Sequence, residues 1–322
     1  MRGVRWIWLC LVICIDAVAH CAMAGAGSYL YVVSQDDGTV AQIDIAAGEV
    51  SSRISAPDAP AMIAPSADGK FIYVTHPDHS AISVIDADAR RVVKTFSYPG
   101  TPFGIAADPH GRFLYVDDWN RGVVTQLDAK TGALMAGAAV GRYPAGLAVA
   151  ADGARLYVAD RDSGAVSIVD AAAMRVIASV ATGTAPFALA LSPDDKRLYV
   201  ANAQSSDLAV IDTQTMQSIA RIRVGAMPYG IAVTPDGKTV VVANQHSDTA
   251  SIIDARSLAV VATVDVGRYP EGVLCAANGL AYVANWFSGD VSVIDLRQRR
   301  ELNRLRVGDG PRAFAITGSS QP

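Results

Sequence analysis

The sequence predicts an all-β fold, a seven-bladed β-propeller of four-stranded antiparallel blades. Three markers support this prediction, because a tyrosine, an aspartate and a proline each recur about every 42 residues. The positions are Tyr31, Tyr73, Tyr115, Tyr157, Tyr199, Val241 (in place of a tyrosine) and Tyr282; Asp44, Asp86, Asp128, Asp170, Asp212, Asp254 and Asp295; and Pro60, Pro102, Pro144, Pro186, Pro228, Pro270 and Pro311. The agreement of three independent markers indicates seven copies of one structural unit.

Each unit has the pattern of four short strands. In the sixth copy, apolar and polar residues alternate over Gly230–Thr234, Thr239–Ala243, Thr249–Asp254 and Val260–Val264. Pro235-Asp236-Gly237 joins the first two strands, since proline presets a turn and glycine accepts a positive φ. A single sheet of this pattern is apolar on both faces, so neighbouring sheets must cover it. A ring of blades meets that requirement.

The two ends of the repeat region are expected to complete one blade together. Tyr29–Ser34 matches the second strand of a unit, and Arg312–Thr317 matches a first strand that has no later partner in the sequence. Pairing these segments closes the ring and removes an exposed sheet edge.

Two short motifs resemble a known family. Tyr199-Val200-Ala201-Asn202 and Tyr282-Val283-Ala284-Asn285 are followed by Leu208-Ala209-Val210-Ile211-Asp212 and Val291-Ser292-Val293-Ile294-Asp295. Over residues 29–317 the chain resembles the YVTN-repeat family of seven-bladed propellers, and its exported YncE-like members in particular. The resemblance implies the fold but not a function, because the motif residues build the blades.

The first 24 residues have the pattern of a secretory signal peptide. Arg2 and Arg5 precede the apolar run Trp6–Ile15, and Ala22-Met23-Ala24 places small residues where a signal peptidase cleaves. The apolar run is shorter than the roughly 20 residues of a membrane-spanning helix. We therefore expect residues 1–24 to be cleaved and residues 25–322 to form one periplasmic or secreted domain, with no transmembrane segment.

Composition and charge exclude several classes of protein. Hydrophobic residues make up 51% of the chain and charged residues 18%, which is typical of a globular protein. Removing residues 1–24 changes the formal net charge from −4 to −5, so binding to nucleic acid is not expected. Cys275 is the only cysteine outside the predicted leader, so no internal disulfide can form in the exported protein, which we expect to be a monomer.

Two sets of loops differ most between the copies, and both are expected on one face of the propeller, the top face. One set surrounds the repeated proline, and the other follows the second strand. They contain aromatic and arginine residues where turns accept Gly, Ser or Asn, which favours a recognition surface over ordinary loop variation. The candidate binding residues are Phe103, Arg142, Tyr143, Phe187, Tyr229, Arg268, Tyr269, Glu271, Arg312, Trp119, His246 and Trp286.

Three of these candidates are expected to meet at the mouth of the central axis. Tyr229, Glu271 and Arg312 directly follow the repeated proline in three consecutive copies, so a closed ring brings them together. If Glu271 and Arg312 simply pair with each other, we expect an exposed ion pair of about 0–1 kcal/mol. An arginine at the mouth favours an anionic or carboxylate-bearing ligand.

The first strands are expected to line the axis, because small residues recur at the point where seven backbones converge. These residues are Gly104, Gly146, Ala188, Gly230, Gly272 and Ala313, and Met62 is the exception. Cys275 is expected to be a small buried hydrophobic residue.

The sequence contains no catalytic or cofactor motif that we recognise. No nucleophile elbow, haem-attachment motif, phosphate loop or dinucleotide fingerprint is present. His76 and His79 with Asp78 are a weak alternative as metal ligands, since a proline-containing loop does not fix their geometry. We therefore expect no metal and no cofactor.

Two hypotheses about function remain open. The first is a non-catalytic scaffold that binds a protein or a small ligand on its top face. The alternative is an enzyme or accessory subunit of periplasmic quinone (PQQ)-dependent oxidation, or a lactonase-like hydrolase, because propellers of similar architecture include such proteins. Its site would lie at the axis mouth, with Glu271 as base and Arg312 as anion clamp. Whether the protein is an enzyme stays open, and the absence of catalytic motifs favours the first hypothesis.

Overall fold

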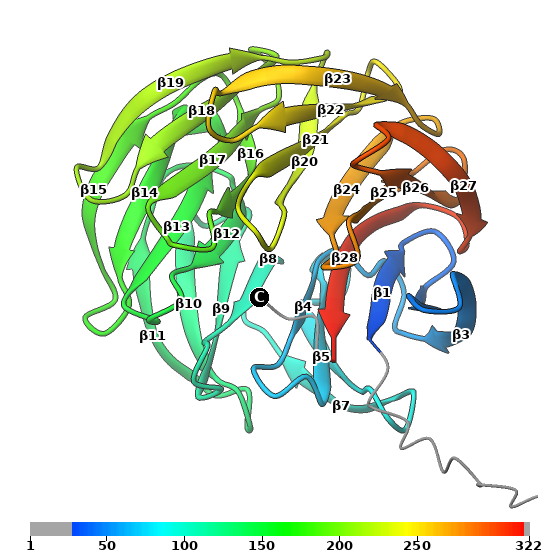
Figure 1. The fold of residues 1–322 in the computed structure, drawn as a ribbon. Helices are drawn as coiled ribbons and strands as arrows, with labels where there is room; N and C mark the ends of the chain where they lie inside the picture. The colour runs from blue at the N-terminus through cyan, green and yellow to red at the C-terminus, as the bar shows by residue number, and fades with distance from the viewer. Residues whose placement is uncertain (1–27, 319–322) are drawn as a thin grey trace, which may run out of the picture.

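A computed structural model describes residues 28–318 and confirms the predicted propeller. Seven four-stranded antiparallel sheets form a ring around a central axis (Figure 1). Two short 3₁₀ turns, η1 (Pro77–His79) and η2 (Arg161–Ser163), are the only helical segments in this part of the chain. The predicted signal peptide, residues 1–24, lies outside the described residues.

Every blade follows the same order from the axis outward. The innermost strands are β28 (Pro311–Thr317), β4 (Ile63–Pro65), β8 (Pro102–Ala107), β12 (Pro144–Val149), β16 (Pro186–Leu191), β20 (Pro228–Val233) and β24 (Pro270–Cys275). The second strands are β1 (Tyr29–Ser34), β5 (Phe71–His76), β9 (Phe113–Asp118), β13 (Arg155–Asp160), β17 (Arg197–Asn202), β21 (Thr239–Asn244) and β25 (Leu280–Asn285). The third strands are β2 (Thr39–Asp44), β6 (Ala81–Asp86), β10 (Val123–Asp128), β14 (Ala165–Asp170), β18 (Asp207–Asp212), β22 (Thr249–Asp254) and β26 (Asp290–Asp295). The outer strands are β3 (Glu49–Ser55), β7 (Arg91–Ser97), β11 (Leu134–Ala139), β15 (Arg175–Ala181), β19 (Gln217–Arg223), β23 (Ala259–Asp265) and β27 (Arg300–Arg306).

The ring closes by pairing the two ends of the described chain. Strand β28 lies antiparallel to β1, with Tyr29 opposite Thr317 and Val33 opposite Ala313. In Figure 1 the red β28 lies close to the blue β1, and together with β2 and β3 they complete one blade. The edge that β1 would otherwise expose is therefore covered.

The repeated tyrosines form the core between blades. Tyr31, Tyr115, Tyr157 and Tyr199 are each at most 2% exposed, and Val241, which replaces a tyrosine, is fully buried. They pack against aliphatic residues of the next blade, which buries the apolar faces that a single sheet would leave open. The repeat keeps this residue large and apolar for a packing reason.

The repeated aspartates terminate the third strands. The Oδ1 atom of Asp128 accepts the backbone N–H groups of Lys130 and Thr131 at 3.0 and 2.7 Å. The same type of contact is made at Asp44, Asp86, Asp170, Asp212, Asp254 and Asp295. These carboxylates satisfy turn donors that would otherwise lack a partner.

The small residues of the inner strands permit close backbone contact around the axis. A Cβ atom on Gly230 would lie 2.0 Å from the carbonyl oxygen of Glu271, and one on Gly272 would lie 2.3 Å from that of Arg312. Both distances are too short for any side chain. The glycines are therefore explained by the convergence of the blades.

Hydrogen bonds join the two variable loop sets on one face. The backbone N–H of Arg161, after the second strand, donates to the carbonyl of Tyr143, in the preceding proline loop, at 3.2 Å. Trp286 and Tyr269 make the corresponding bond at 3.0 Å. The top face is defined hereafter as the face that these two loop sets form.

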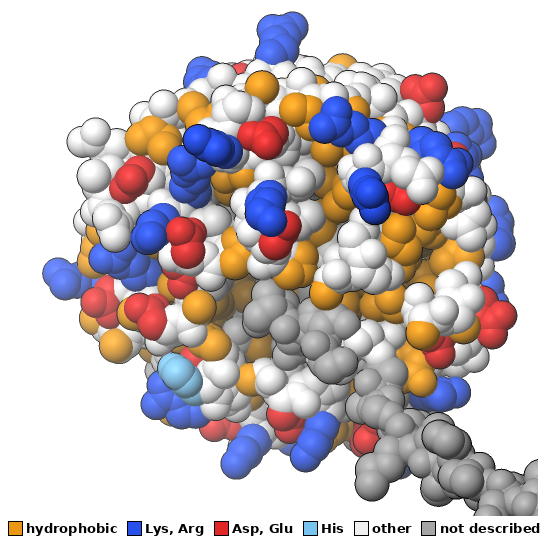
Figure 2. All heavy atoms as spheres, viewed as in Figure 1, with side chains coloured by type: hydrophobic (Ala, Val, Ile, Leu, Met, Phe, Trp, Pro, Cys, Tyr) orange, Lys and Arg blue, Asp and Glu red, His pale blue; other side chains and the backbone are white. Residues whose placement is uncertain are grey.

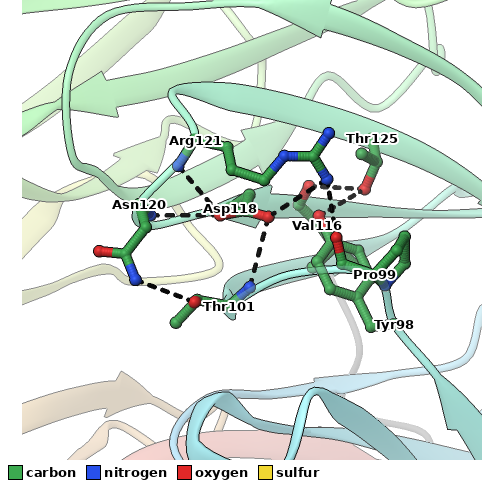
Figure 3. Close-up of polar contacts among 8 residues, drawn as sticks. All are labelled: Tyr98, Pro99, Thr101, Val116, Asp118, Asn120, Arg121 and Thr125. Atoms are coloured by element: carbon green, nitrogen blue, oxygen red, sulfur yellow. Dashed lines mark hydrogen bonds and ion pairs between the residues drawn. The ribbon is translucent and has the colours of Figure 1, made fainter.

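Each second strand ends in a polar residue, and in two blades this residue holds the incoming loop by a hydrogen bond. Figure 3 shows Asp118, whose Oδ1 accepts the backbone N–H groups of Asn120 and Arg121 at 3.2 and 3.1 Å. Its Oδ2 accepts the N–H of Thr101, in the loop that enters the blade, at 3.3 Å. Asn202 occupies the same place in its blade and accepts the N–H of Gly183 at 3.0 Å. This position, the last residue of the YVTN-like motif, is therefore structural.

The surface seen in Figure 2 has mixed charge. Lys and Arg side chains lie among Asp and Glu side chains over this face, with hydrophobic side chains between them. Within residues 28–318 no helix is both long enough and apolar enough to cross a membrane.

Candidate functional site

The residues that directly follow the repeated prolines form a ring around the top of the axis. Four of the seven are large, namely Phe103, Phe187, Tyr229 and Arg312, and a fifth is Glu271. Ala61 and Ala145, which complete the set, are fully buried beside them. The ring is densely packed, since Phe103, Phe187 and Glu271 are only 9%, 6% and 5% exposed.

The guanidinium of Arg312 is held by groups from several blades. Its Nε lies 3.3 Å from Oε2 of Glu271 on β24, and its Nη2 donates to the Tyr229 hydroxyl on β20 at 3.3 Å. Its Nη1 donates to Oε1 of Gln35, which follows β1. The Cζ atom of the guanidinium lies 5.5 Å from the Phe103 ring centre and 5.3 Å from that of Trp286. These contacts fix the cation at the mouth of the axis.

The pair formed by Glu271 and Arg312 is buried, so the expectation of an exposed pair is wrong. The two side chains are only 6% and 10% exposed. The aromatic rings of Phe103 and Trp286, from two blades other than that of Arg312, lie against the Arg312 guanidinium. Burial raises the pKa of Glu271 to about 7, although the positive charge of Arg312 acts in the opposite direction.

Gln245 completes the polar group at the mouth. Its Nε2 donates to Oε1 of Glu271 at 3.0 Å, and the Gln245 residue is 2% exposed. Oε1 of Gln245 has no hydrogen-bond partner among the residues that the structure describes, and Oε2 of Glu271 has the ion pair with Arg312 but no hydrogen bond. Buried acceptors without partners are uncommon and require an explanation.

Aromatic rings cover one side of the mouth. Phe187 and Tyr229 stack with ring centres 3.8 Å apart, and Phe103 lies 4.9 Å from Trp119 and 6.0 Å from Phe187. Trp119 also contacts Tyr143, at 5.9 Å. We call these five residues the aromatic cluster. Burial raises the pKa of Tyr229, so its hydroxyl keeps its proton at neutral pH.

A cavity lies below this ring, within the axis. Its volume is about 160 Å³. Its polar lining residues are Glu271, Arg312 and Tyr229, and the inner strands supply backbone and small apolar side chains such as Gly146 and Ala188. None of the described residues that line it is a histidine.

Four predicted site residues lie away from this group. His246, Tyr269 and the exposed Phe287 form a second aromatic group on the top face, with centre distances of 5.7 and 4.5 Å. Arg142 and Arg268 are exposed, and each donates to a backbone carbonyl of the adjacent loop. The structure therefore brings together Phe103, Trp119, Tyr143, Phe187, Tyr229, Glu271, Trp286 and Arg312, with Tyr143 joined through Trp119, and leaves Arg142, His246, Arg268 and Tyr269 outside them.

Sequence reasoning missed two residues at the mouth, Gln35 and Gln245. Both directly follow a second strand, at the same repeat position as Trp119 and Trp286. That shared position was the available signal. A third residue, Asp117 on β9, is fully buried, and its Oδ1 accepts the Gly104 N–H at 2.8 Å. Burial raises the pKa of Asp117 well above its usual range.

The metal alternative gains no support from the geometry. His76 is fully buried, with Nδ1 3.3 Å from the Asp58 carbonyl, whereas His79 is exposed. Across residues 28–318 no group of three or more His, Cys, Asp and Glu side chains is placed to hold a metal ion. Cys275 is 9% exposed among apolar residues, and burial raises its pKa to about 12.

Comparison with known proteins supports the propeller fold, and two of the matches have descriptions that name heme d1 or a D1 heme domain. A model of the cytochrome D1 heme domain matches residues 133–231 and 156–272, which is less than half of the chain. Hydrazine synthase of Kuenenia stuttgartiensis is 21% identical, with a TM-score of 0.73 over 83% of this chain and 92% of its own. A protein of unknown function from Desulfotomaculum acetoxidans is 15% identical, with a TM-score of 0.79 over 90% of this chain and 99% of its own.

A third solved structure is the dihydro-heme d1 dehydrogenase NirN in complex with DHE. It is 15% identical to this chain, with a TM-score of 0.68 over 89% of this chain and 74% of its own. No curated protein matches the chain. At identities of 15–21%, these solved structures show that the propeller fold is shared, and they say nothing about a shared activity.

Proposed function

We propose that this protein is an exported, non-catalytic propeller that binds a small ligand at the top-face mouth of its axis. The ligand has a flat apolar part and an anionic group. One observation supports this proposal above the others: the Arg312 guanidinium lies at the edge of the aromatic cluster, above a cavity. Guanidinium groups bind carboxylates in two-pronged geometry, and aromatic faces bind flat apolar groups.

The finer classification remains part of this proposal. The YVTN-like motifs favour the YncE-like branch of propellers, with residues 1–24 removed and residues 25–322 forming a monomer in the periplasm or outside the cell. The match to the cytochrome D1 heme domain is compatible with a propeller that binds a small molecule at its axis.

The residues at the mouth do not fit an iron tetrapyrrole enclosed in the axis. The cavity is about 160 Å³, and its lining contains no histidine among the described residues. Tyr229, the one phenol in the lining, accepts a hydrogen bond from Arg312 and keeps its proton, which disfavours metal ligation. We therefore assign no haem to this site.

The enzyme hypothesis has less support than binding. A general base needs access to the proton that it removes, whereas the Glu271 carboxylate faces Arg312 and Gln245 and is 5% exposed. A partner protein on the outer top face is supported mainly by one observation, the 59% exposure of Phe287. The buried cation and the cavity favour a small ligand.

The binding experiment uses 2-naphthoate, a flat carboxylate, and 2-naphthamide, its neutral analogue. Titration calorimetry at pH 6, together with tryptophan fluorescence, should show binding of the carboxylate and at least tenfold weaker binding of the amide. Arg312→Lys should weaken naphthoate binding at least tenfold, because lysine lacks the forked donor geometry. Arg142→Lys is the matched control at an exposed top-face arginine and should leave the affinity unchanged.

Thermal unfolding of both variants checks that they are folded. No binding of either probe, or equal losses in the two lysine variants, would contradict a ligand site at the axis.

A further inference from the structure

Glu271 and Gln245 are joined by one hydrogen bond, and a proton on Glu271 would give the pair a second donor. The amide Nε2 of Gln245 donates to Oε1 of Glu271 at 3.0 Å, and Oε1 of Gln245 has no hydrogen-bond partner among the described residues. Oε2 of Glu271 lies 3.3 Å from Arg312 Nε as an ion pair but makes no hydrogen bond to a described residue, so it would lose its one polar neighbour if Arg312 bound another anion. A protonated carboxyl group has one O–H donor beside its acceptor oxygen. A proton on Oε2 could be donated to Oε1 of Gln245, which would pair both atoms in a two-bond acid–amide ring.

The charges at the mouth permit one negative charge beside Arg312. Arg312 and Glu271 together are neutral when both are ionised, and their side chains are 10% and 6% exposed. A ligand anion that joined them would leave a net negative charge in a buried site, which is costly. A proton on Glu271 would restore neutrality and release Arg312 for the ligand.

We propose that an anionic ligand replaces the Glu271 carboxylate at Arg312 and that Glu271 takes up one proton as the ligand binds. This inference rests on the proposed function and specifies how the site accepts its ligand. Arg312 exchanges one carboxylate for another, and Glu271 stays in place as a neutral acid bonded to Gln245. No covalent bond forms or breaks apart from the transfer of this proton from solvent.

The groups that face Glu271 are compatible with this exchange. They are Arg312 on β28, Tyr229 on β20, Gln245 after β21, and Asp36 in the loop after β1. Arg312 favours the ionised form, whereas burial and the negative charge of Asp36 favour the protonated form. The resulting pKa of about 7 means that protonation costs little near neutral pH.

The experiment measures proton uptake and affinity together. Calorimetric titration with 2-naphthoate is performed from pH 6 to pH 9 in two buffers of different ionisation enthalpy. At pH 8.5 the protein should take up about one proton per bound naphthoate, and the affinity should fall about tenfold for each pH unit above 7. The probe itself stays ionised throughout this range.

Two variants test whether Glu271, and not another acidic residue, takes up the proton. In Glu271→Gln no proton uptake is expected, and the affinity should not change between pH 6 and pH 9. Asp162→Asn, at an exposed loop position, is the matched acid-to-amide control and should keep the uptake and the pH dependence of the original protein.

The outcomes distinguish this inference from the proposed function. Binding of naphthoate at pH 6 and pH 8.5 with equal affinity and no proton uptake would overturn the exchange and leave the binding site intact. No binding at pH 6 would overturn both. The proton uptake is measured on the unmodified protein, so the test does not depend on whether a variant folds.

Discussion

Arg312 Nε and Glu271 Oε2 lie 3.3 Å apart in an ion pair that is almost completely buried at the mouth of the propeller. The pair connects β28, the strand that closes the ring, with β24 of the neighbouring blade. It therefore belongs both to the closure of the fold and to the candidate site. An isolated charge in this position would be far more costly than the pair.

Removal of Arg312 alone should destabilise the protein more than removal of both charges of the Arg312–Glu271 pair. At pH 8, Arg312→Met should lower the free energy of unfolding by about 3–5 kcal/mol, because the buried Glu271 loses its counter-charge and must either stay ionised or take up a proton from a solution in which free glutamate is ionised. The double variant Glu271→Gln/Arg312→Met should lose less. Loss of Arg312 removes the charge that lowers the pKa of Glu271, and a lower pH makes protonation of this buried carboxyl group less costly, so the difference between the two variants should shrink at pH 6. Urea unfolding at both pH values measures this, and equal losses at pH 8 would contradict a charged buried pair.

Asp117 should reduce stability at neutral pH. Burial raises its pKa in the folded protein, so between about pH 4, the ordinary value for aspartate, and this raised pKa the folded state binds more protons than the unfolded state. Its contribution to stability is therefore present at low pH and is lost as the pH rises through that interval. Alanine occupies the equivalent position at Ala159, Ala201, Ala243 and Ala284, all fully buried.

Asp117→Ala should consequently gain stability relative to the original protein as the pH rises from 4 to 8. The quantity to measure is the difference in unfolding free energy between the two proteins at each pH. Asp162→Ala, at an exposed loop position, is the control and should show a constant difference. A constant difference for Asp117→Ala as well would show that its carboxyl group has an ordinary pKa.

Tyr199 should stabilise the protein through its ring and not through its hydroxyl. The residue is 1% exposed within an apolar cluster. Tyr199→Ala should cost about 3–5 kcal/mol, as other large aromatic truncations do. Tyr199→Phe should cost at most about 0.5–1.5 kcal/mol. Tyr31→Phe is a useful comparison and should cost more than Tyr199→Phe, because the Tyr31 hydroxyl accepts a hydrogen bond from Gln42 Nε2 at 2.6 Å.

These tyrosine variants are compared by thermal and urea unfolding. If Tyr199→Phe proved as damaging as Tyr199→Ala, the hydroxyl and not the ring would be the important group.

Deletion of residues 310–322 should prevent stable folding. The deletion removes β28, which pairs with β1 along Tyr29–Val33 and supplies Ala313 and Ala315 to the core. Blade closure and the Arg312 contacts are lost together. Deletion of residues 319–322 leaves β28 complete and should keep the original melting temperature. A cooperative transition of the longer deletion near that temperature would show that closure through β28 is dispensable.

The sequence by itself determined the number of blades, the strands of each blade and the face that carries the variable loops. These features follow from local pattern, because alternation of period two defines a strand and turn residues define its ends. The buried tyrosines and the aspartate turns can likewise be predicted from the residues next to them in the sequence. Only the tertiary structure decided which loop residues meet at the axis and how deeply they are buried.

The position of a residue within the repeat determines where its backbone lies in the ring. It does not determine which residues its side chain contacts. Arg312 contacts Tyr229, two blades away, and lies against Phe103 on the other side of the mouth. The burial of Glu271, and its contact with Gln245, depends on the side chains that several other blades bring to the same place. Residues far apart in the chain exclude water from this pair together, so no stretch of sequence around Glu271 or Arg312 could predict it.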